Sequence, residues 1–362
     1  MQSGATGAAR PVPTGRLTNR GYPMPSLLSF SKGLGIDLGT IQTRIADGNG
    51  VLVDEPTVVA LIINEQKIVE FGKAAREMQG RVLTEEIEVT QPLQNGVVAD
   101  YDITEALLHY LLQRVSGPMR FFRPRAMVTV PYGVTSVESR AVHEAVLQAG
   151  CRDAYLIQQP LAAALGVDLP IGAPSGNMII CLGGGTTQAA VVSMYSIVSA
   201  ETMRSGGMQL DEAISAYVRR KYGVVIGQVM AEQLKIKIGA AVPQEREESL
   251  EVQGQDQVSG LPRPVTLTTG EIVEALEEPL KQIIEICRHV LEKTPPELVS
   301  DIIDRGVALC GGGALLRGMD KLLTKALGIP AYLVGNPTTS AVEGAVKALG
   351  MYAVLRRNLP PV

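Results

Sequence analysis

A short segment near the N-terminus combines a carboxylate with a glycine–threonine turn. The apolar run Leu34–Leu38 contains Asp37, and Gly39 and Thr40 interrupt it before a second strand-like segment begins. Such a turn brings backbone N–H groups and a hydroxyl to one point, which suits the terminal phosphates of a nucleotide. A carboxylate two residues before the glycine is placed to hold a water on phosphate-bound Mg²⁺. Because hairpins of this composition also occur for purely structural reasons, this segment alone leaves both interpretations open.

The same pattern occurs a second time, about a domain further along the chain. The apolar run 177–182 is followed by three glycines and two threonines at 183–187, and a second strand-like run covers 189–194. Two such hairpins, each opening an alternating β/α segment, indicate an internal duplication. Two phosphate-binding turns that face each other across a cleft would hold a nucleotide between two lobes.

Two further segments are candidates for nucleotide contacts. Val307–Cys310 leads into a glycine-rich turn at 311–313, which allows a backbone to approach a base or phosphate closely. The turn lacks the lysine of a P-loop, so a Walker motif is not predicted. Glu232 and Lys235 lie three residues apart on one face of a predicted helix, 231–238, where a solvated ion pair is the simpler explanation.

The composition limits the class of protein. A length of 362 residues predicts two or more domains, and a formal net charge of -4 argues against nucleic acid as a partner. The cysteines lack CxxC spacing, which predicts reduced thiols and excludes a cysteine-based zinc site. No apolar run reaches the roughly 20 residues of a membrane span, and the N-terminus lacks the features of a secretory signal. We therefore expect a cytoplasmic protein, with a location on a membrane surface left open.

Two segments could touch a membrane. Residues 1–32 are predicted to be a disordered tail, with a short apolar stretch at 27–30 that either contacts lipid or simply precedes the first strand. Phe121 and Phe122 lie in a loop bounded by proline and glycine and flanked by arginines. Because apolar rings beside cations suit the surface of an anionic bilayer, we expect the two phenylalanines to contact a membrane instead of packing beneath the loop.

Several helices are predicted from spacing and capping. Thr135 and Glu138 form a capping-box pattern at the start of a helix that runs to 149. A long amphipathic helix is expected over 271–293 and a last helix over 339–355. The proline- and glycine-rich residues 167–176 are the expected boundary between the two halves.

The order of these motifs resembles the actin/Hsp70/sugar-kinase superfamily, and more closely the bacterial actin family MreB/Mbl. The resemblance covers roughly residues 33–357 and is carried by the segments 35–40, 54–60, 96–102, 137–141, 183–187, 206–207, 235–239 and 311–318. It implies an α/β, actin-like (ribonuclease H-like duplicated) fold with two lobes of two subdomains around a nucleotide cleft.

The resemblance also implies domain limits and partners. Lobe I would comprise 33–175 plus 338–357 with an insertion (IB) at about 64–112, and lobe II would comprise 176–337 with an insertion (IIB) at about 212–265. Members of the family form antiparallel double protofilaments on the inner membrane and guide cell-wall synthesis. The implied partners are therefore other copies of the chain, the inner face of the cytoplasmic membrane and membrane proteins of cell shape and wall synthesis.

Site residues follow from the resemblance position by position. Asp37 would hold Mg²⁺ through water, Glu138 would activate the attacking water, and Phe121 and Phe122 would form the membrane loop. The implied ATP contacts are Thr40, Ile41, Gln42, Gly183, Gly184, Gly185, Thr186, Glu232, Gln233, Leu234, Lys235, Gly312, Gly313, Ala314 and Leu315.

The chain departs from the family pattern beside the phosphates. Cys181 stands where the family has aspartate, Gln188 where it has glutamate, and Gln158 and Gln159 where it has two glutamates. Carboxylates there would hold Mg²⁺ through water and orient the attacking water. We therefore expect nucleotide binding to be retained, with Mg²⁺ affinity and hydrolysis weakened.

Four functions are compatible with this sequence. The leading one is an ATP-binding, membrane-associated, actin-like filament for cell shape, at most a weak filament-coupled ATPase. The alternatives are a non-polymerising pseudo-ATPase that regulates other filaments, a small-molecule kinase and an Hsp70-like chaperone. A kinase needs a catalytic aspartate in the cleft, for which no candidate stands out. A chaperone needs a substrate-binding domain after the ATPase, and the sequence ends at Val362.

Overall fold

The first predicted hairpin opens a five-stranded sheet. The computed structural model describes residues 33–361 except 66, 82–85 and 117–122, so the predictions for the tail 1–32 and for Phe121 and Phe122 lie outside the described residues. The strand order is β10-β9-β1-β2-β3, in which β1 to β3 form an antiparallel meander and β9 and β10 add parallel strands. These strands are β1 (Gly33–Leu38), β2 (Gln42–Asp47), β3 (Gly50–Pro56), β9 (Arg125–Val130) and β10 (Asp153–Gln158).

The second predicted hairpin opens a sheet of the same design. Its order is β13-β12-β11-β17-β18, again an antiparallel meander with two added parallel strands. Its strands are β11 (Asn177–Leu182), β12 (Thr187–Ser193), β13 (Ser196–Met203), β17 (Val307–Cys310) and β18 (Ala331–Leu333). The predicted internal duplication is therefore confirmed at the level of strand order.

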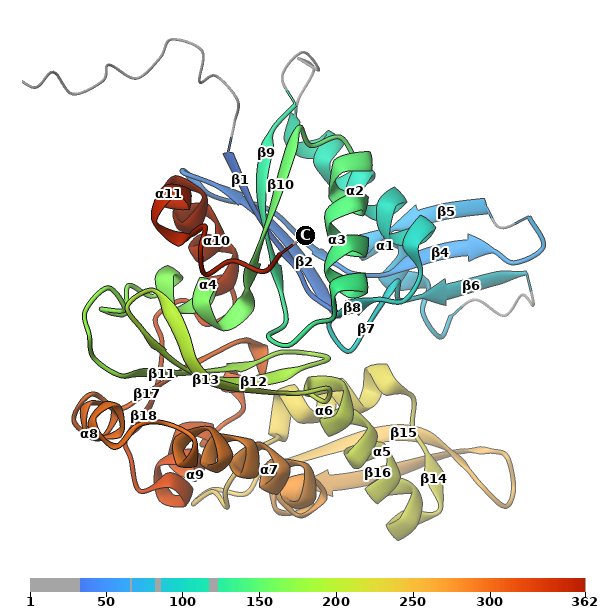
Figure 1. The fold of residues 1–362 in the computed structure, drawn as a ribbon. Helices are drawn as coiled ribbons and strands as arrows, with labels where there is room; N and C mark the ends of the chain where they lie inside the picture. Colours follow the sequence, from blue (N-terminus) through green and yellow to red (C-terminus); the bar gives the residue numbers. More distant parts are fainter. Residues whose placement is uncertain (1–32, 66, 82–85, 117–122, 362) are drawn as a thin grey trace, which may run out of the picture.

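Two helices lie between the two sheets (Figure 1). α4 (Gln159–Gly166) and α10 (Ser340–Gly350) share one buried cluster with side chains from both sheets, among them Met127 and Ile179. Their contact is so close that a Cβ atom on Gly344 would lie 1.6 Å from the carbonyl oxygen of Ala162. The helix predicted over 339–355 is interrupted at Met351, after which the short α11 (Tyr352–Leu355) follows.

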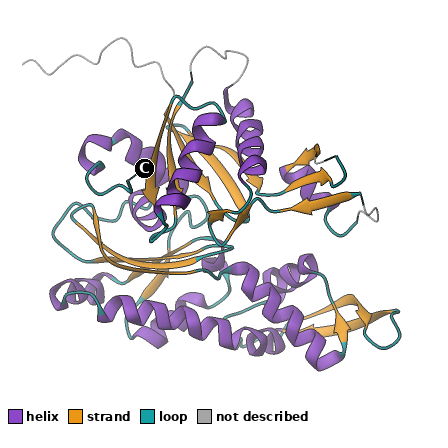
Figure 2. Cartoon of the chain, turned by 45° about the vertical axis from the view of Figure 1, so that its right-hand side comes forward, coloured by secondary structure: helices purple, strands orange, loops and turns teal. Residues whose placement is uncertain are grey.

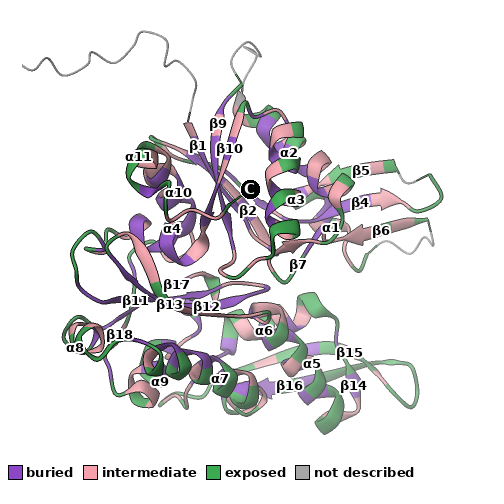
Figure 3. Ribbon diagram, viewed as in Figure 1, coloured by how far each residue is buried: buried purple, intermediate pink, exposed green. Residues whose placement is uncertain are grey.

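Further helices cover the outer faces of the sheets. α2 (Tyr101–Ser116) and α3 (Ser136–Gln148) pack on the first sheet, and α7 (Thr269–Glu292), α8 (Pro296–Arg305) and α9 (Met319–Leu327) flank the second. Both faces of β11 and β12 are consequently buried, as Figure 3 shows. The predicted long amphipathic helix corresponds to α7. No helix in the described part of the chain has the length and apolar character that a membrane crossing requires.

A small sheet extends from the same side of each large sheet (Figure 2). The first consists of β4 (Val59–Ile62), β5 (Lys67–Phe71) and β6 (Ile87–Thr90), next to α1 (Gly72–Met78). The second consists of β14 (Val224–Val225), β15 (Ser249–Asp256) and β16 (Pro262–Thr268). The remaining elements are the hairpin β7 (Leu93–Gln94) and β8 (Val97–Val98), the helices α5 (Gly207–Tyr222) and α6 (Gln228–Ile238), and the 3-10 turn η1 (Gly312–Leu315).

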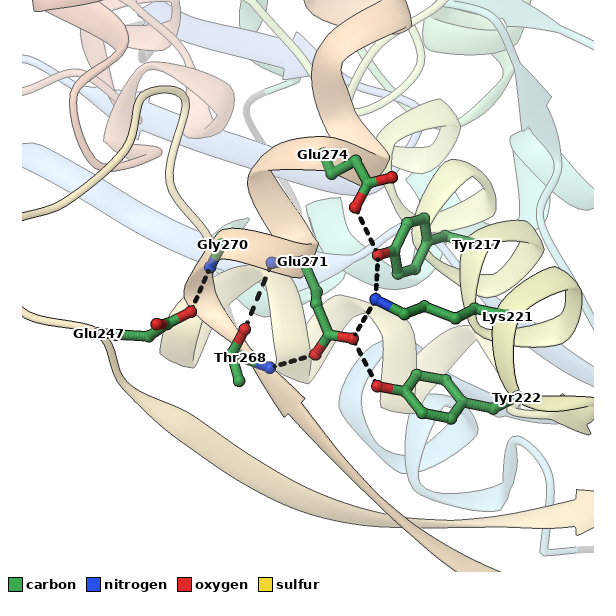
Figure 4. Close-up of polar contacts among 8 residues, drawn as sticks. All are labelled: Tyr217, Lys221, Tyr222, Glu247, Thr268, Gly270, Glu271 and Glu274. Carbon is green, nitrogen blue, oxygen red and sulfur yellow. Dashed lines mark hydrogen bonds and ion pairs between the residues drawn. The ribbon is translucent and has the colours of Figure 1, made fainter.

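A polar network holds α5 against the start of α7 (Figure 4). The Glu271 carboxylate completes a capping box with Thr268, accepts a hydrogen bond from Tyr222 and lies 2.8 Å from the Lys221 ammonium. The Tyr217 hydroxyl of α5 donates to the Glu274 carboxylate of α7 at 2.7 Å. Burial opposes the charge of Glu271, but the surrounding donors outweigh it and lower the pKa of this carboxyl group. The network therefore joins the C-terminal half of α5 to the N-terminal end of α7, directly after β16.

The α4–α10 contact predicts an unusual response to a helix-favouring substitution. In an ordinary helix interior, Gly→Ala stabilises by about 1 kcal/mol. Because a methyl group on Gly344 would overlap Ala162, we expect Gly344→Ala to lower the free energy of unfolding, by about 2 kcal/mol or more, in urea denaturation. Gly350, at the end of the same helix, has open space around its Cβ position, so Gly350→Ala is the control and is expected to cause no loss. Equal effects of the two substitutions would contradict this packing.

Candidate functional site

The two glycine turns and the third glycine-rich turn meet at one cavity of about 440 Å³. The cavity lies where β1, β11 and β17 end and β2 begins, so the turn that follows the first strand of each duplicated sheet lies at it. Ten of the fifteen predicted nucleotide contacts line it, together with Asp37, which was predicted to hold Mg²⁺ through water: Thr40, Ile41, Gln42, Gly183, Gly184, Glu232, Lys235, Gly312, Gly313 and Leu315. The structure therefore brings together residues from four separate parts of the sequence.

The other predicted contacts do not belong to the lining. Leu234 and Ala314 have their side chains in the apolar core of the second lobe. Gly185 packs against Thr40, the Thr186 side chain faces Gly96, and Gln233 is exposed on α6. For these positions a nucleotide contact stays a prediction, since none of them lines the cavity.

The two turns that are predicted to bind phosphates touch each other directly. A Cβ atom on Gly184 would lie 2.1 Å from Cγ1 of Ile41, and one on Gly185 would lie 2.4 Å from Oγ1 of Thr40. The Thr40 hydroxyl also accepts a hydrogen bond from the Gly96 backbone N–H at 2.8 Å. Only glycine lets the backbone of the second turn approach the Ile41 and Thr40 side chains this closely, which explains the residue type at positions 184 and 185.

Asp37 is buried at the end of β1. Its Oδ1 atom accepts hydrogen bonds from the Thr129 hydroxyl at 2.6 Å and the Gln159 amide at 3.2 Å. Burial raises the pKa of the Asp37 carboxyl group, and the two donors only partly offset this effect. The predicted carboxylate is therefore present, but it is already engaged by the protein.

The residues that depart from the family pattern have different surroundings. The Gln159 amide oxygen accepts from Gln188 Nε2 at 2.5 Å, and Gln188 Oε1 accepts from the Tyr132 backbone N–H at 2.8 Å. Gln158, in contrast, ends β10 outside the cavity lining, and its Oε1 atom is buried without a hydrogen-bond partner. The resemblance implied that Gln158 and Gln159 both lie beside the phosphates, whereas of these two only Gln159 lines the cavity.

Cys181 faces a second thiol. It pairs in register with Cys310 on the neighbouring parallel strand, with 3.2 Å between the two Sγ atoms, and both residues line the cavity. The hydrogen bond to Cys310 and burial raise the pKa of the Cys181 thiol far above its ordinary value. A neutral thiol therefore occupies the position where the family has a carboxylate.

These groups do not fit a dedicated Mg²⁺ site. Mg²⁺ prefers oxygen ligands, carboxylates above all. Of the other carboxylates in the cavity lining, Asp211 pairs with Lys235 at 2.7 Å and Glu232 pairs with Arg76 of α1. Only Asp37 is left beside the two turns, among neutral amides and thiols.

Glu138 lies outside the cavity lining. The predicted capping box with Thr135 is confirmed, and Oε1 of Glu138 pairs at 2.8 Å with Arg204, which follows β13 in the other lobe. Burial opposes the charge of Glu138, but Thr135 and Arg204 lower the pKa of this carboxyl group. The carboxylate thus links the two lobes, and its role in activating water stays a prediction.

Several residues of the cavity were missed at the level of sequence. Asp211 lies one helical turn after Gly207, and this spacing after the Gly206-Gly207 turn was the available signal. Ile236, which is 68% exposed, was also missed, and together with the predicted Leu315, which is 54% exposed, it offers an apolar wall for a flat ligand. Arg76 of α1 lies outside the lining but pairs with Glu232 in it, and no local pattern connects the two residues.

Known proteins resemble this chain along most of its length. The family model described as MreB/Mbl protein matches residues 31–357. The cell shape-determining protein Mbl of Bacillus subtilis is 42% identical over 316 residues, which cover 87% of this chain and 95% of that protein. The cell shape-determining protein MreB of Escherichia coli strain K12 is 43% identical over 329 residues, which cover 89% and 94% of the two chains.

Solved structures confirm the predicted actin-like fold. MreB5 of Spiroplasma citri, bound to ADP, superposes with a TM-score of 0.85 at 31% identity, covering 91% of this chain and 99% of that one. A MamK double helical filament shares the fold with a TM-score of 0.74 at 20% identity, covering 88% and 98% of the two chains.

The Asp211–Lys235 pair predicts a pH dependence of stability. Burial raises the pKa of the Asp211 carboxyl group to about 6, against an ordinary value of 3.8. The folded chain therefore holds this proton at pH values where the unfolded chain has lost it, and stability is lost as the pH rises through this window. Relative to Asp211→Asn, the wild type should lose on the order of 2 kcal/mol of unfolding free energy between about pH 4 and pH 7.

Urea denaturation at a series of pH values measures this difference. Asp304→Asn, at an exposed position on α8, is the matched control and should follow the wild type. Parallel pH profiles for the wild type and Asp211→Asn would contradict the prediction.

Proposed function

The chain belongs to the MreB/Mbl family, and we propose that it is an ATP-binding, actin-like cytoskeletal filament protein that acts in cell-shape determination. The cavity between the equivalent ends of the duplicated sheets carries this proposal, because both glycine turns and the third glycine-rich turn converge on it. The turns at 39–42 and 183–185 hold the phosphates, and Ile236 and Leu315 flank the base. That MreB5 of Spiroplasma citri binds ADP and AMPPNP supports a nucleotide in this cavity.

Self-association is the second part of the proposal. The filament form of MamK, which shares the fold, supports polymers of this chain, for which we propose antiparallel protofilaments. We place these polymers in the cytoplasm, on the inner face of the cytoplasmic membrane, where they organise membrane proteins of cell-wall synthesis. A net charge of -4 argues against nucleic acid as a partner.

Hydrolysis is expected to be slow. Cys181, Gln159 and Gln188 supply no negative charge beside the phosphates, and the Glu138 carboxylate is paired with Arg204. Loss of a single charged group in phosphoryl transfer can lower the rate by orders of magnitude.

These same observations favour a second candidate function, a non-polymerising pseudo-ATPase that regulates other bacterial actin filaments. Electron microscopy of the full chain with ATP separates the two, since only the first predicts filaments.

The proposal that Leu315 flanks the base predicts that a charge at this position weakens nucleotide binding. Leu315→Asp replaces an apolar contact with a charge, which should weaken binding of a fluorescent ATP analogue about tenfold, equivalent to about 1.4 kcal/mol. Ile303→Asp is the matched control, because Ile303 is similarly exposed, at 52%, but lies on α8 away from the cavity. Unchanged affinity of Leu315→Asp would remove Leu315 from the proposed site.

Membrane association has its own test. Replacing both Phe121 and Phe122 with serine removes two apolar rings beside arginines, so cosedimentation with anionic liposomes should fall severalfold. The control replaces Val258 and Leu261 with serine, two side chains that are 97% and 65% exposed between β15 and β16. Full liposome binding by the double phenylalanine variant would contradict the membrane role of this loop.

A further inference from the structure

We propose that Gln159 and Gln188 form an amide clasp which replaces a divalent cation between the lobes, so that this chain binds nucleotide nearly independently of Mg²⁺. This inference rests on the proposed nucleotide site and concerns its cofactor requirement. The clasp is defined here as the hydrogen bonds that join Asp37, Gln159, Gln188 and the Tyr132 backbone.

The clasp passes repeatedly between the two large sheets. Gln159, at the start of α4, donates to Asp37 on β1 and accepts from Gln188 on β12. Gln188 in turn accepts from the Tyr132 N–H, and the Tyr132 carbonyl accepts from the Thr202 hydroxyl on β13, each at 2.8 Å. A continuous chain of direct hydrogen bonds therefore connects the end of β1 with two strands of the other sheet.

The chemistry of the amide group makes these bonds possible. Each glutamine side chain has both a donor and an acceptor, so it can accept from one neighbour and donate to the next. Gln188 uses its amide in this way while its side chain is fully buried, at 0% exposure. Buried, fully satisfied polar groups hold a unique arrangement because any displacement leaves one of them without a partner.

Carboxylates at the same positions could not make the same bonds. Two ionised carboxylates lack a donor and repel at hydrogen-bond distance, so they need a proton or a cation between them. With glutamates at 159 and 188 next to Asp37, three acidic groups would gather at the centre of the molecule, and a divalent cation would relieve their repulsion. With glutamines at 159 and 188, Asp37 is the one acidic group of the clasp, so no cation is required to bring the lobes together.

The wild-type chain tests the proposal without any substitution. ATP affinity is measured by calorimetry on the full chain, once with excess MgCl₂ and once with excess EDTA. We expect the two dissociation constants to agree within about threefold. A loss of affinity in EDTA greater than about tenfold would overturn the clasp as a cation substitute. Absence of ATP binding under both conditions would instead contradict the proposed nucleotide site, so the two failures are distinguishable.

Restoring the carboxylates should restore the cation requirement. For Gln159→Glu combined with Gln188→Glu, binding in EDTA should fall more than about tenfold relative to binding in MgCl₂. Gln158→Glu is the matched control, because Gln158 is the neighbouring residue and takes no part in the clasp. It should keep the wild-type ratio. A double variant that remains insensitive to EDTA would contradict the proposal, and the single change Gln188→Glu serves if the double variant does not fold.

Discussion

The direct contact between the glycine–threonine turn after β1 and the glycine turn after β11 is the constraint on which the rest of the structure depends. Gly184 lies against Ile41 and Gly185 against Thr40, closer than any side chain would permit. This approach requires two sheets that present their hairpin ends toward each other, and the equivalent strand orders of the duplicated halves provide that arrangement. It also requires a spacer of fixed thickness between the sheets. α4 and α10 form this spacer, and their own contact is held at backbone distance by Gly344 and Gly166.

The features that the sequence predicted correctly are those set by neighbouring residues. The two hairpins, the Thr135–Glu138 capping box and the long helix near 271–293 follow from turn chemistry, a local hydrogen-bond pair and a 3.6-residue period. Contacts between segments that are far apart in the sequence leave no local pattern of residue types or spacing from which they could be predicted. Neither the Arg76–Glu232 pair nor the Gln159–Gln188 bond can be found from spacing, because each joins elements that only the folded sheets bring together. Motif resemblance located the cavity, but it could not separate Gln159 from Gln158, whose side chains have different surroundings.

The connections between the lobes differ in kind between the centre and the rim of the molecule. At the rim, Glu138–Arg204 and Arg76–Glu232 join charged side chains that remain partly exposed to solvent. Such pairs contribute little net stability, since water and salt compete with them. At the centre, Gln188 is fully buried and all of its hydrogen bonds are made within the protein. Loss of a buried partner there costs more than loss of a rim pair, because the remaining group keeps its desolvation penalty.

This difference between centre and rim bears on how an actin-like protein responds to its nucleotide. In a cleft lined with carboxylates, the cation and the phosphates together determine whether the lobes approach, so the bound nucleotide controls their separation. Where neutral amides already join the lobes, the nucleotide changes that separation less, because its differential contacts with the closed state are fewer. Under the proposed function, the amides and thiols that stand where the resemblance implies acidic groups would affect two properties at once. They would lower the charge available for hydrolysis, and they would reduce the dependence of lobe closure on the ligand.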